Sequence, residues 1–531
     1  MNRREFLAST VGVGLLGVGQ DRKLDLVLRG GLVVDGTGAP GRMADIGVRC
    51  ERIVSIGDLS RSAAHRTIDV SGLVVSPGFI DVHTHSEDEL LTNPKAESKV
   101  RQGVTTEILG MDGGSYEPAQ FAEKLRELQA VGAAVNVASF VGQGTIRGVV
   151  LSTTDRAANE SELTSMRRLA AVALENGALG ISSGLEYTPG GFASADEIAD
   201  LCAVMRGTGG LYATHLRNED DRVVESVEEA VSIAERAGVG LHISHLKCQG
   251  RRNWDKVDRV FAVLDAAEAR GVSVTLDRYP YIAYSTSLAN LMPLWSREGG
   301  TPKFIERLED ASIWPRIREE VADKVALLGS WDAVMVSSVP SAKNKPFEGK
   351  TITQIVQDTG EDPFVATRRL IVEEDNRVGM VGFGMSEKNT ERILGHPKCM
   401  PASDGSALAD YGPLAEGNPH PRSYGTFARV LGMYVREKRT LTLEEAVRKM
   451  TSLPATRFSL GKRGRLSEGF YADVVVFDSN TVADRATFAE PHQYAQGFEI
   501  VVANGRIVLE KGTRTDELPG KVLLGEHGAR A

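Results

Sequence analysis

Short apolar stretches of strand length alternate with helical patterns through the middle of the chain. Each stretch ends in polar residues, and a helical pattern follows most of them, for example at 160–176 and 225–238. The eight stretches are 75–85, 104–111, 134–141, 179–183, 211–215, 240–245, 272–277 and 399–404. This alternation is typical of parallel βαβ units. We therefore expect an α/β fold, a TIM-like (β/α)8 barrel.

The two ends of the chain have a different pattern, with short β-rich stretches separated by Gly and Asp turns. They lie at 24–28, 32–34, 45–48, 52–56 and 67–70, and again at 472–477, 498–502 and 506–509. Neither end is long enough to bury a core alone. We therefore expect residues 21–77 and 464–514 to form one small β-sandwich domain, residues 78–463 the barrel, and residues 515–531 a tail.

The interval between the seventh and eighth stretches is much longer than the others. It contains helical patterns at 302–309 and 315–325 and a further strand-like stretch near 378–383. We expect an insertion at about 287–350 on the loop side of the barrel, where it would cover a substrate.

Composition narrows the class of partner. The 531 residues carry a formal net charge of −9, which argues against nucleic acid or an anionic membrane as the main partner. None of the four cysteines lies in a CxxC pair, so neither a zinc knuckle nor a disulfide scaffold is indicated.

The first 20 residues resemble a twin-arginine export signal. Arg3 and Arg4 precede Phe6, Leu7 and a short apolar stretch that is too short to form a stable membrane span. We expect export to the periplasm; the alternative is a frayed N-terminal helix on a cytoplasmic protein. A GxGxxG match at 12–17 lies inside this stretch and follows no strand, so it does not predict a dinucleotide site.

Metal-binding and acidic side chains stand at the ends of five of the eight stretches, which is the active-site edge of such a barrel. His83 and His85 alternate in a strand and therefore point to the same side. Imidazole is a common ligand of Zn²⁺. The full set of expected metal ligands is His83, His85, Asp112, His215, His245 and Asp404.

Two of these carboxylates have a simpler alternative role. Asp404 is expected to be the catalytic base beside a metal-activated water, although Asp is also a common helix N-cap. Asp112 is expected to ligate or bridge metal, although a turn Asp before Gly113-Gly114 is chemically reasonable. A GxSxG match at 180–184 lacks the helix that a nucleophile elbow requires, so a serine hydrolase is not favoured.

Several longer motifs resemble the amidohydrolase superfamily, and in particular its N-acyl-D-amino-acid deacylase (D-aminoacylase) branch. They are PGFIDVHTH at 77–85, GVTTE at 103–107, YATHLRNE at 212–219, ISHLK at 243–247, DRYPY at 277–281, SDG at 403–405, HPRSYGTF at 420–427 and GFYADVVVFD at 469–478. The resemblance extends from about residue 24 to residue 514.

The resemblance implies one or two zinc ions, with His215 and His245 holding the tighter one and His83, His85 and Asp404 surrounding a weaker site. It also implies four residues near the substrate carboxylate: Lys247, Tyr279, Ser285 and Arg422. The chain departs from the family at Asp112, where these enzymes usually have cysteine. A hard carboxylate in place of a soft thiolate is expected to change metal preference and weaken zinc retention.

The expected activity is metal-dependent hydrolysis of a C–N amide bond other than an ordinary peptide bond, an EC 3.5.1-like reaction. The expected substrate is a small N-acyl-D-amino acid or a peptide containing a D-residue. The alternatives are a cyclic-amide hydrolase of the hydantoinase or dihydroorotase kind, an isoaspartyl dipeptide hydrolase, and a non-catalytic solute-binding protein on a decayed barrel.

Overall fold

The computed structural model describes residues 23–525, so the expected export signal lies outside the described residues. Eight strand positions run parallel, as the alternating pattern predicts. They are β6 (Phe79–Asp81), β7 (Val104–Leu109), β8 (Asn136–Ser139) continued by β9 (Val141–Gly142), β10 (Gly180–Gly184), β11 (Leu211–His215), β12 (Gly240–Ile243), β13 (Val274–Arg278) and β17 (Cys399–Pro401). They form two parallel sheets, β6-β7-β8 and β9-β10-β11-β12-β13-β17.

The two sheets meet at two places, so the strand order follows a (β/α)8 barrel whose hydrogen-bond ladder is interrupted twice. Only Phe140 separates β8 from β9. On the other side, a single parallel bridge joins Thr84 to Gly405. Buried Lys99 reinforces this second junction, because its ammonium donates to Asp81 at 2.9 Å and to the carbonyl of Gly405 at 3.0 Å.

Helices cover the outside of the parallel strands, and they begin and end at residues that are favourable helix caps. Asn159 and Glu162 form a capping box at the start of α6, and Gly238 ends α8 in the left-handed conformation. The covering helices are α4 (Phe121–Val131), α5 (Gln143–Leu151), α6 (Glu160–Glu175), α7 (Ala195–Cys202), α8 (Val223–Ala237), α9 (Val257–Ala269), α14 (Glu387–Gly395) and α16 (Leu443–Met450). No helix in the described part of the chain has the length and apolar character needed to cross a bilayer.

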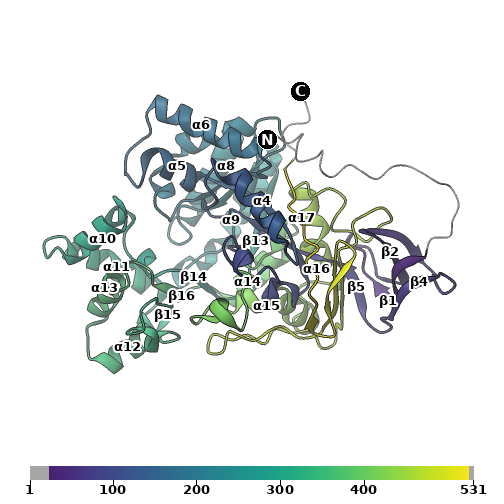
Figure 1. Ribbon diagram of the computed structural model, residues 1–531. Helices are drawn as coiled ribbons and strands as arrows, with labels where there is room; N and C mark the ends of the chain where they lie inside the picture. Colours follow the sequence, from purple (N-terminus) through teal and green to yellow (C-terminus); the bar gives the residue numbers. More distant parts are fainter. Residues whose placement is uncertain (1–22, 526–531) are drawn as a thin grey trace.

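Both chain ends contribute to one nine-stranded sheet, which explains why neither end needs a core of its own. Figure 1 shows the purple N-terminal strands beside the yellow C-terminal ones. The strands are β1 (Leu24–Val33), β2 (Arg42–Arg49), β3 (Arg52–Gly57), β4 (Ala64–Asp69), β5 (Val74–Pro77), β18 (Val474–Phe477), β19 (Phe498–Ala503), β20 (Arg506–Glu510) and β21 (Thr513–Arg514). The antiparallel pairing of β5 with β18 joins the two ends.

The inserted unit is longer than the expected range of about 287–350. It begins with β14 (Ala283–Ser287), and its antiparallel sheet is completed by β15 (Val334–Ser338) and β16 (Gly379–Phe383). Because β16 pairs with β14, the inserted unit ends only after β16, just before α14 begins. Helices α10 (Gly300–Glu309), α11 (Trp314–Leu328), α12 (Ile352–Thr359) and α13 (Pro363–Glu373) surround the sheet and give it a separate apolar core. The unit lies opposite the nine-stranded sheet in Figure 1.

The described part of the expected tail is built into the fold. Val522 forms a parallel bridge with Val137 of β8, and the Val137 amide donates to the carbonyl of Lys521 at 2.9 Å. This segment therefore provides hydrogen-bond partners for β8.

Candidate metal centre

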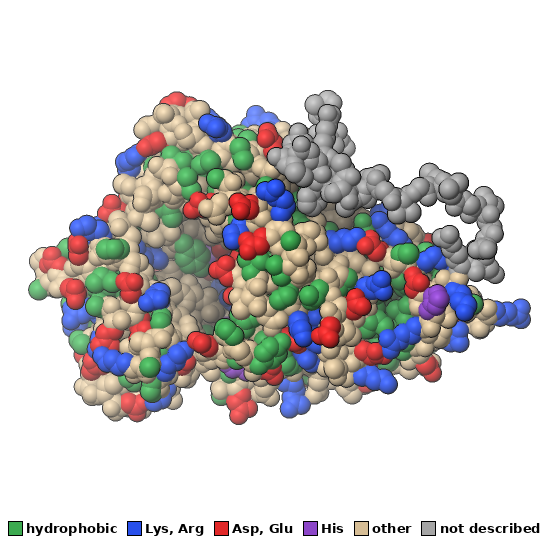
Figure 2. Space-filling model, viewed as in Figure 1, with side chains coloured by type: hydrophobic (Ala, Val, Ile, Leu, Met, Phe, Trp, Pro, Cys, Tyr) green, Lys and Arg blue, Asp and Glu red, His purple; other side chains and the backbone are tan. Residues whose placement is uncertain are grey.

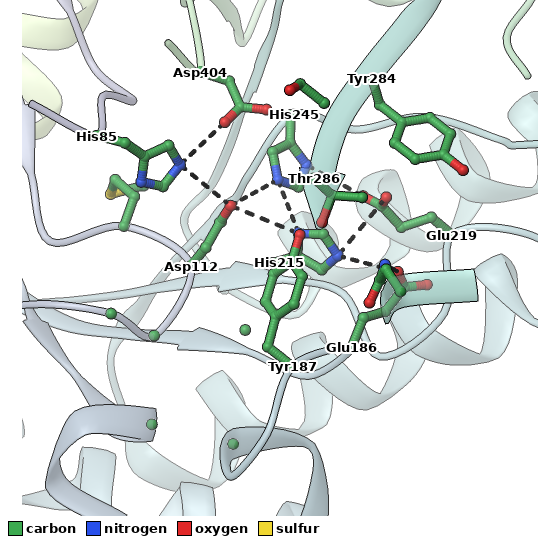
Figure 3. A pocket seen from close by; sticks show the side chains of 18 of the residues that line it. His85, Asp112, Glu186, Tyr187, His215, Glu219, His245, Tyr284, Thr286 and Asp404 are labelled. Carbon is green, nitrogen blue, oxygen red and sulfur yellow. Dashed lines mark hydrogen bonds and ion pairs between the residues drawn. The ribbon is translucent and has the colours of Figure 1, made fainter. Parts of the chain in front are cut away.

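The six expected ligands come together at the carboxyl ends of the parallel strands. His215 is the last residue of β11, and the other five follow β6, β7, β12 and β17 within a few residues. Figure 3 shows His85, Asp112, His215, His245 and Asp404 directed toward a common space. The strand ends therefore bring together side chains that are hundreds of residues apart.

Three of these ligands have a left-handed backbone. The φ angle is 55° at Asp112, 31° at His245 and 49° at Asp404. This region is unfavourable for residues other than glycine, and it tends to occur where surrounding structure enforces it at functional sites. The turn at Asp112 is held by Ser182, which donates to the carbonyl of Gly110 at 2.5 Å and accepts from the Gly113 amide at 3.1 Å. The GxSxG serine is thus part of the support for Asp112.

One carboxylate oxygen of Asp112 lies at the centre of the cluster. Its Oδ2 atom is 3.3 Å from His83 Nε2 and 3.1 Å from His245 Nε2. The same oxygen is 3.7 Å from His85 Nε2 and 3.7 Å from His215 Nδ1. Asp112 is therefore shared by two sets of ligands. It also lies in a turn before Gly113, as its simpler alternative role predicted.

We call the first set, His83, His85 and Asp404, the open ligand group. Asp404 Oδ1 lies 3.1 Å from His85 Nε2 and 3.5 Å from His83 Nε2. The His85 side chain is 39% exposed, the largest exposure in the cluster. The residues that follow Asp404 are not helical, so Asp404 is not a helix N-cap.

A buried aspartate orients His83 from behind. Asp277 Oδ2 lies 3.3 Å from His83 Nδ1 and 2.9 Å from His242 Nε2. The other oxygen of Asp277 accepts the backbone amide of His245 at 2.8 Å. With Nδ1 turned toward Asp277, His83 presents Nε2 to the cluster, an arrangement common behind metal-binding histidines.

The second set, His215 and His245, is the buried ligand group. His215 Nδ1 lies 3.0 Å from His245 Nε2, and the two side chains are 5% and 2% exposed. Glu219 lies behind both rings, 3.1 Å from His245 Nδ1 and 3.8 Å from His215 Nε2. Lys247 pairs with Glu219 at 2.5 Å. The two imidazoles are thus held by a carboxylate that itself has a cationic partner.

The chemistry of this donor set fits one or two divalent metal ions. His83 Nε2 and Asp112 Oδ1 are buried without a hydrogen-bond partner among the described residues. Such atoms are costly unless something binds them. Two sets of ligand atoms are close enough to hold an ion each: His83, His85, Asp112 and Asp404, and Asp112, His215 and His245. Imidazole and carboxylate ligands suit zinc.

Both carboxylates of the cluster are anionic, as ligation requires. Burial alone would raise the pKa of Asp112, but His83 and His245 hold it well below its ordinary value. Burial acts in the same direction on Asp404, and the Arg422 guanidinium at 2.6 Å outweighs it and lowers the pKa.

The four expected substrate residues line one cavity of about 620 Å³ together with most of the metal-ligand cluster. Lys247, Tyr279 and Arg422 come from the barrel side, whereas Ser285 lies on β14 of the inserted unit. The Tyr279 hydroxyl is buried and has no hydrogen-bond partner among residues 23–525. In Figure 2 the surface is hollowed between the inserted unit and the rest of the molecule.

Sequence reasoning assigned no role to Glu186, Glu219 or Asp277, although all three surround the histidines. Both Asp277 and Glu219 lie in motifs already noted. Asp277 ends the seventh stretch, and Glu219 lies four residues after His215. Glu186 follows β10 in the segment that replaced the helix of a nucleophile elbow. A polar residue at a strand end was therefore a usable signal in each case.

A sequence profile of the amidohydrolase family matches residues 66–259 and 406–509. The chain is 38% identical to a D-aminoacylase of Alcaligenes xylosoxydans xylosoxydans, over 94% of this chain and 97% of the relative.

Two solved structures are similar over nearly the whole chain. An N-acyl-D-glutamate deacylase from Bordetella bronchiseptica, complexed with zinc and a phosphonate mimic of the tetrahedral intermediate, has a TM-score of 0.81 at 35% identity, covering 95% of this chain and 100% of that one. A D-aminoacylase with a binuclear metal center has a TM-score of 0.80 at 36% identity, covering 94% and 100%.

Proposed function

The chain belongs to the amidohydrolase family, and we propose that it is a metal-dependent deacylase of N-acyl-D-amino acids or of peptides containing a D-residue. The observation that carries the proposal is the cluster of four histidines around Asp112, with Asp404 facing the same cavity. This cluster offers imidazole and carboxylate ligands for zinc at the edge where barrel enzymes have their active sites. A decayed barrel with only a binding role would not need to retain it.

Asp404 has the surroundings of a general base. Metal ions held by the cluster would polarise the amide carbonyl and lower the pKa of an attacking water toward ~7. Asp404 turns Oδ1 toward His83 and His85, while Arg422 holds Oδ2 at 2.6 Å and keeps the carboxylate ionised. It would accept the proton of the attacking water and deliver it to the leaving amine.

The cations of the cavity support recognition of the substrate carboxylate. Arg422 uses one guanidinium nitrogen for Asp404, and its fork has further donors. Lys247 is a point charge in the same cavity, and the Tyr279 hydroxyl, which has no hydrogen-bond partner within residues 23–525, adds a donor. Ser285 would add a contact from the inserted unit, so substrate binding would draw that unit and the barrel together.

A hydrolysis screen tests the proposal. We expect protein reconstituted with zinc to release free amino acids from N-acetyl-D-amino acids faster than from the L-enantiomers, and we expect a chelator to abolish release. Turnover of hydantoins or isoaspartyl dipeptides alone would instead favour the cyclic-amide or dipeptide alternative. No turnover of any compound by metal-loaded protein would contradict hydrolysis.

We also propose that the protein is exported to the periplasm. Arg3 and Arg4 before an apolar stretch support a twin-arginine signal. Replacing both arginines with lysine is expected to leave the protein in the cytoplasmic fraction of a bacterial host. An unchanged distribution would support a cytoplasmic protein.

A further inference from the structure

His420 joins the barrel side of the cavity to the inserted unit through both nitrogens of its ring. Its Nδ1 atom accepts the backbone amide of Arg422 at 3.0 Å, and its Nε2 atom donates to the carbonyl of Ala283 at 3.0 Å. Arg422 is the first residue of α15 (Arg422–Arg429), and Ala283 is the first residue of β14. An amide can only donate and a carbonyl can only accept, so the two contacts require a neutral imidazole with its proton on Nε2.

The surroundings of His420 keep the ring in this state and orientation. The residue is 3% exposed, and the rings of Tyr279, Tyr281 and Phe488 pack around it with centroids 6.1, 5.2 and 5.0 Å away. Burial and the Arg422 guanidinium hold the pKa of His420 well below its ordinary value. The imidazole is therefore held with both hydrogen bonds in place.

Each of the two joined segments carries a residue of the expected carboxylate site. Arg422 brings its guanidinium to the cavity, and Ser285 lies two residues after Ala283 on β14. Both residues line the cavity, one from the barrel side and one from the inserted unit. The separation between these two substrate-binding residues thus depends on how α15 and β14 are held together, and the ring of His420 spans the two segments.

A simpler role for His420 would be to cap α15. The first amides of a helix have no intrahelical partner, and Nδ1 satisfies the one that belongs to Arg422. A cap needs only this nitrogen, so it leaves the bond from Nε2 to the inserted unit unexplained. At the other end of α15, Arg429 donates to the carbonyl of Pro280 at 2.8 Å. The helix is therefore joined at both ends to the segment that leads into β14.

We propose that His420 is a positioning residue of the substrate-carboxylate site, where it sets the separation between Arg422 and Ser285. This inference rests on the proposed function and on the expected role of these two residues in it. Hydrogen bonds weaken steeply outside a narrow range of distance and angle, and a misplacement of ~1 Å can cost up to ~10²-fold in rate. Loss of either hydrogen bond of His420 should therefore weaken recognition of the substrate carboxylate.

Two compounds of nearly the same shape measure this recognition. They are the N-acetyl-D-amino acid that is hydrolysed fastest, for example N-acetyl-D-leucine, and its neutral amide, for example N-acetyl-D-leucinamide. The ratio of their kcat/KM values for release of acetate isolates the carboxylate, because a change at the metal ions or at Asp404 affects both compounds alike. An amide that is not hydrolysed is measured as a competitive inhibitor instead. We expect the wild-type protein to favour the carboxylate by at least about tenfold.

Two variants of His420 remove one hydrogen bond each. His420→Asn places its amide oxygen near the position of Nδ1, so it can accept the Arg422 amide but does not reach Ala283. His420→Gln places its amide nitrogen near the position of Nε2, so it can donate to Ala283 but leaves the Arg422 amide without its acceptor. We expect each variant to lower the carboxylate-to-amide ratio by about tenfold while zinc content stays unchanged. A capping role alone predicts the wild-type ratio in His420→Asn.

The chain contains a matched control in a second histidine that is followed by proline and a cation, His396-Pro397-Lys398. The Nδ1 atom of His396 accepts the Lys398 amide at 3.4 Å, its ring packs against Phe261, and it lies outside the cavity lining. His396→Asn and His396→Gln should therefore leave the ratio unchanged.

Ser285→Ala tests the proposal from the inserted unit. It removes one partly exposed hydroxyl and leaves both hydrogen bonds of His420 in place, so we expect it to fold even if a His420 variant does not. It should lower the ratio as well. A wild-type ratio in Ser285→Ala, in His420→Asn or in His420→Gln overturns the proposal. No turnover of any N-acetyl-D-amino acid by zinc-loaded wild-type protein would instead count against deacylation itself.

Discussion

The open and buried ligand groups meet at the same oxygen of Asp112, yet their surroundings differ. His215 and His245 are almost fully buried, and Glu219 stands behind both rings. The open group also contains one fully buried ring, that of His83, but its His85 side chain is 39% exposed and its Asp404 carboxylate faces the cavity and is held by Arg422.

This contrast separates two tasks within one cluster. Buried imidazoles oriented by a charged partner are suited to retaining a metal ion, because their rings cannot turn away and water has little access. A group with an exposed histidine and a proton-accepting carboxylate is suited to exchange and to chemistry. We therefore infer that the buried group holds metal and that the open group performs proton transfer.

Replacing one histidine in each ligand group tests this difference with the largest expected effect. We expect His215→Ala to lose most of its bound zinc and to lower kcat/KM by more than about 10³-fold, because water activation is lost with the metal. His85→Ala should retain close to one equivalent of zinc, measured by elemental analysis after dialysis. Equal zinc loss in the two variants would contradict the division of tasks.

Asp404→Asn should separate chemistry from metal binding. The amide cannot accept the proton of the attacking water, so we expect kcat to fall by ~10²–10⁴-fold while zinc content stays nearly unchanged. The control is Asp410→Asn in the same loop, an exposed residue that contacts Tyr494 and should have full activity. Retention of most activity in Asp404→Asn would mean that another group is the base.

Asp277→Asn should affect the open group through His83. The amide oxygen can still accept the backbone amide of His245, but the charged partner of His83 Nδ1 is lost. We expect the affinity for the weaker metal ion to fall by roughly 10–100-fold, with little change in the tighter one. A metal titration followed by calorimetry measures both, and a loss confined to the tighter ion would place the support of Asp277 in the buried group.

Asp112→Cys is expected to have the smallest effect, and it tests the residue that both ligand groups share. A thiolate binds zinc more tightly than a carboxylate, so we expect zinc transfer to a chelator to slow by about tenfold. Faster zinc loss from the cysteine variant would show that zinc retention depends on a carboxylate shared by both ligand groups and not on the softness of the ligand atom.

The clustering of the six expected ligands was predictable because its sequence signals are local. The alternation of His83 and His85 and the position of His215 at a strand end follow from strand geometry, and barrel topology then brings distant strand ends together. The same reasoning separates His242 from the ligands, and in the structure it packs against Asp277 and Thr275.

The features that sequence reasoning missed depend on long-range geometry. The left-handed conformations of Asp112 and Asp404 are enforced by tertiary contacts, and residue type alone does not reveal them. The contact of Glu186 with the inserted unit is equally non-local, because Asn290, about 100 residues further along the chain, donates to it at 3.2 Å. The pairing of Val522 with β8 joins segments that are nearly 400 residues apart, and no local pattern marks it.

Zinc-edge anomalous diffraction from crystals of the zinc-loaded protein tests the central claim most directly. We predict a strong peak at bonding distance, about 2.0–2.2 Å, from Asp112, His215 and His245. A second, weaker peak is predicted beside His83, His85 and Asp404. Anomalous peaks that lie away from Asp112, or a stronger peak in the open group than in the buried one, would contradict the account.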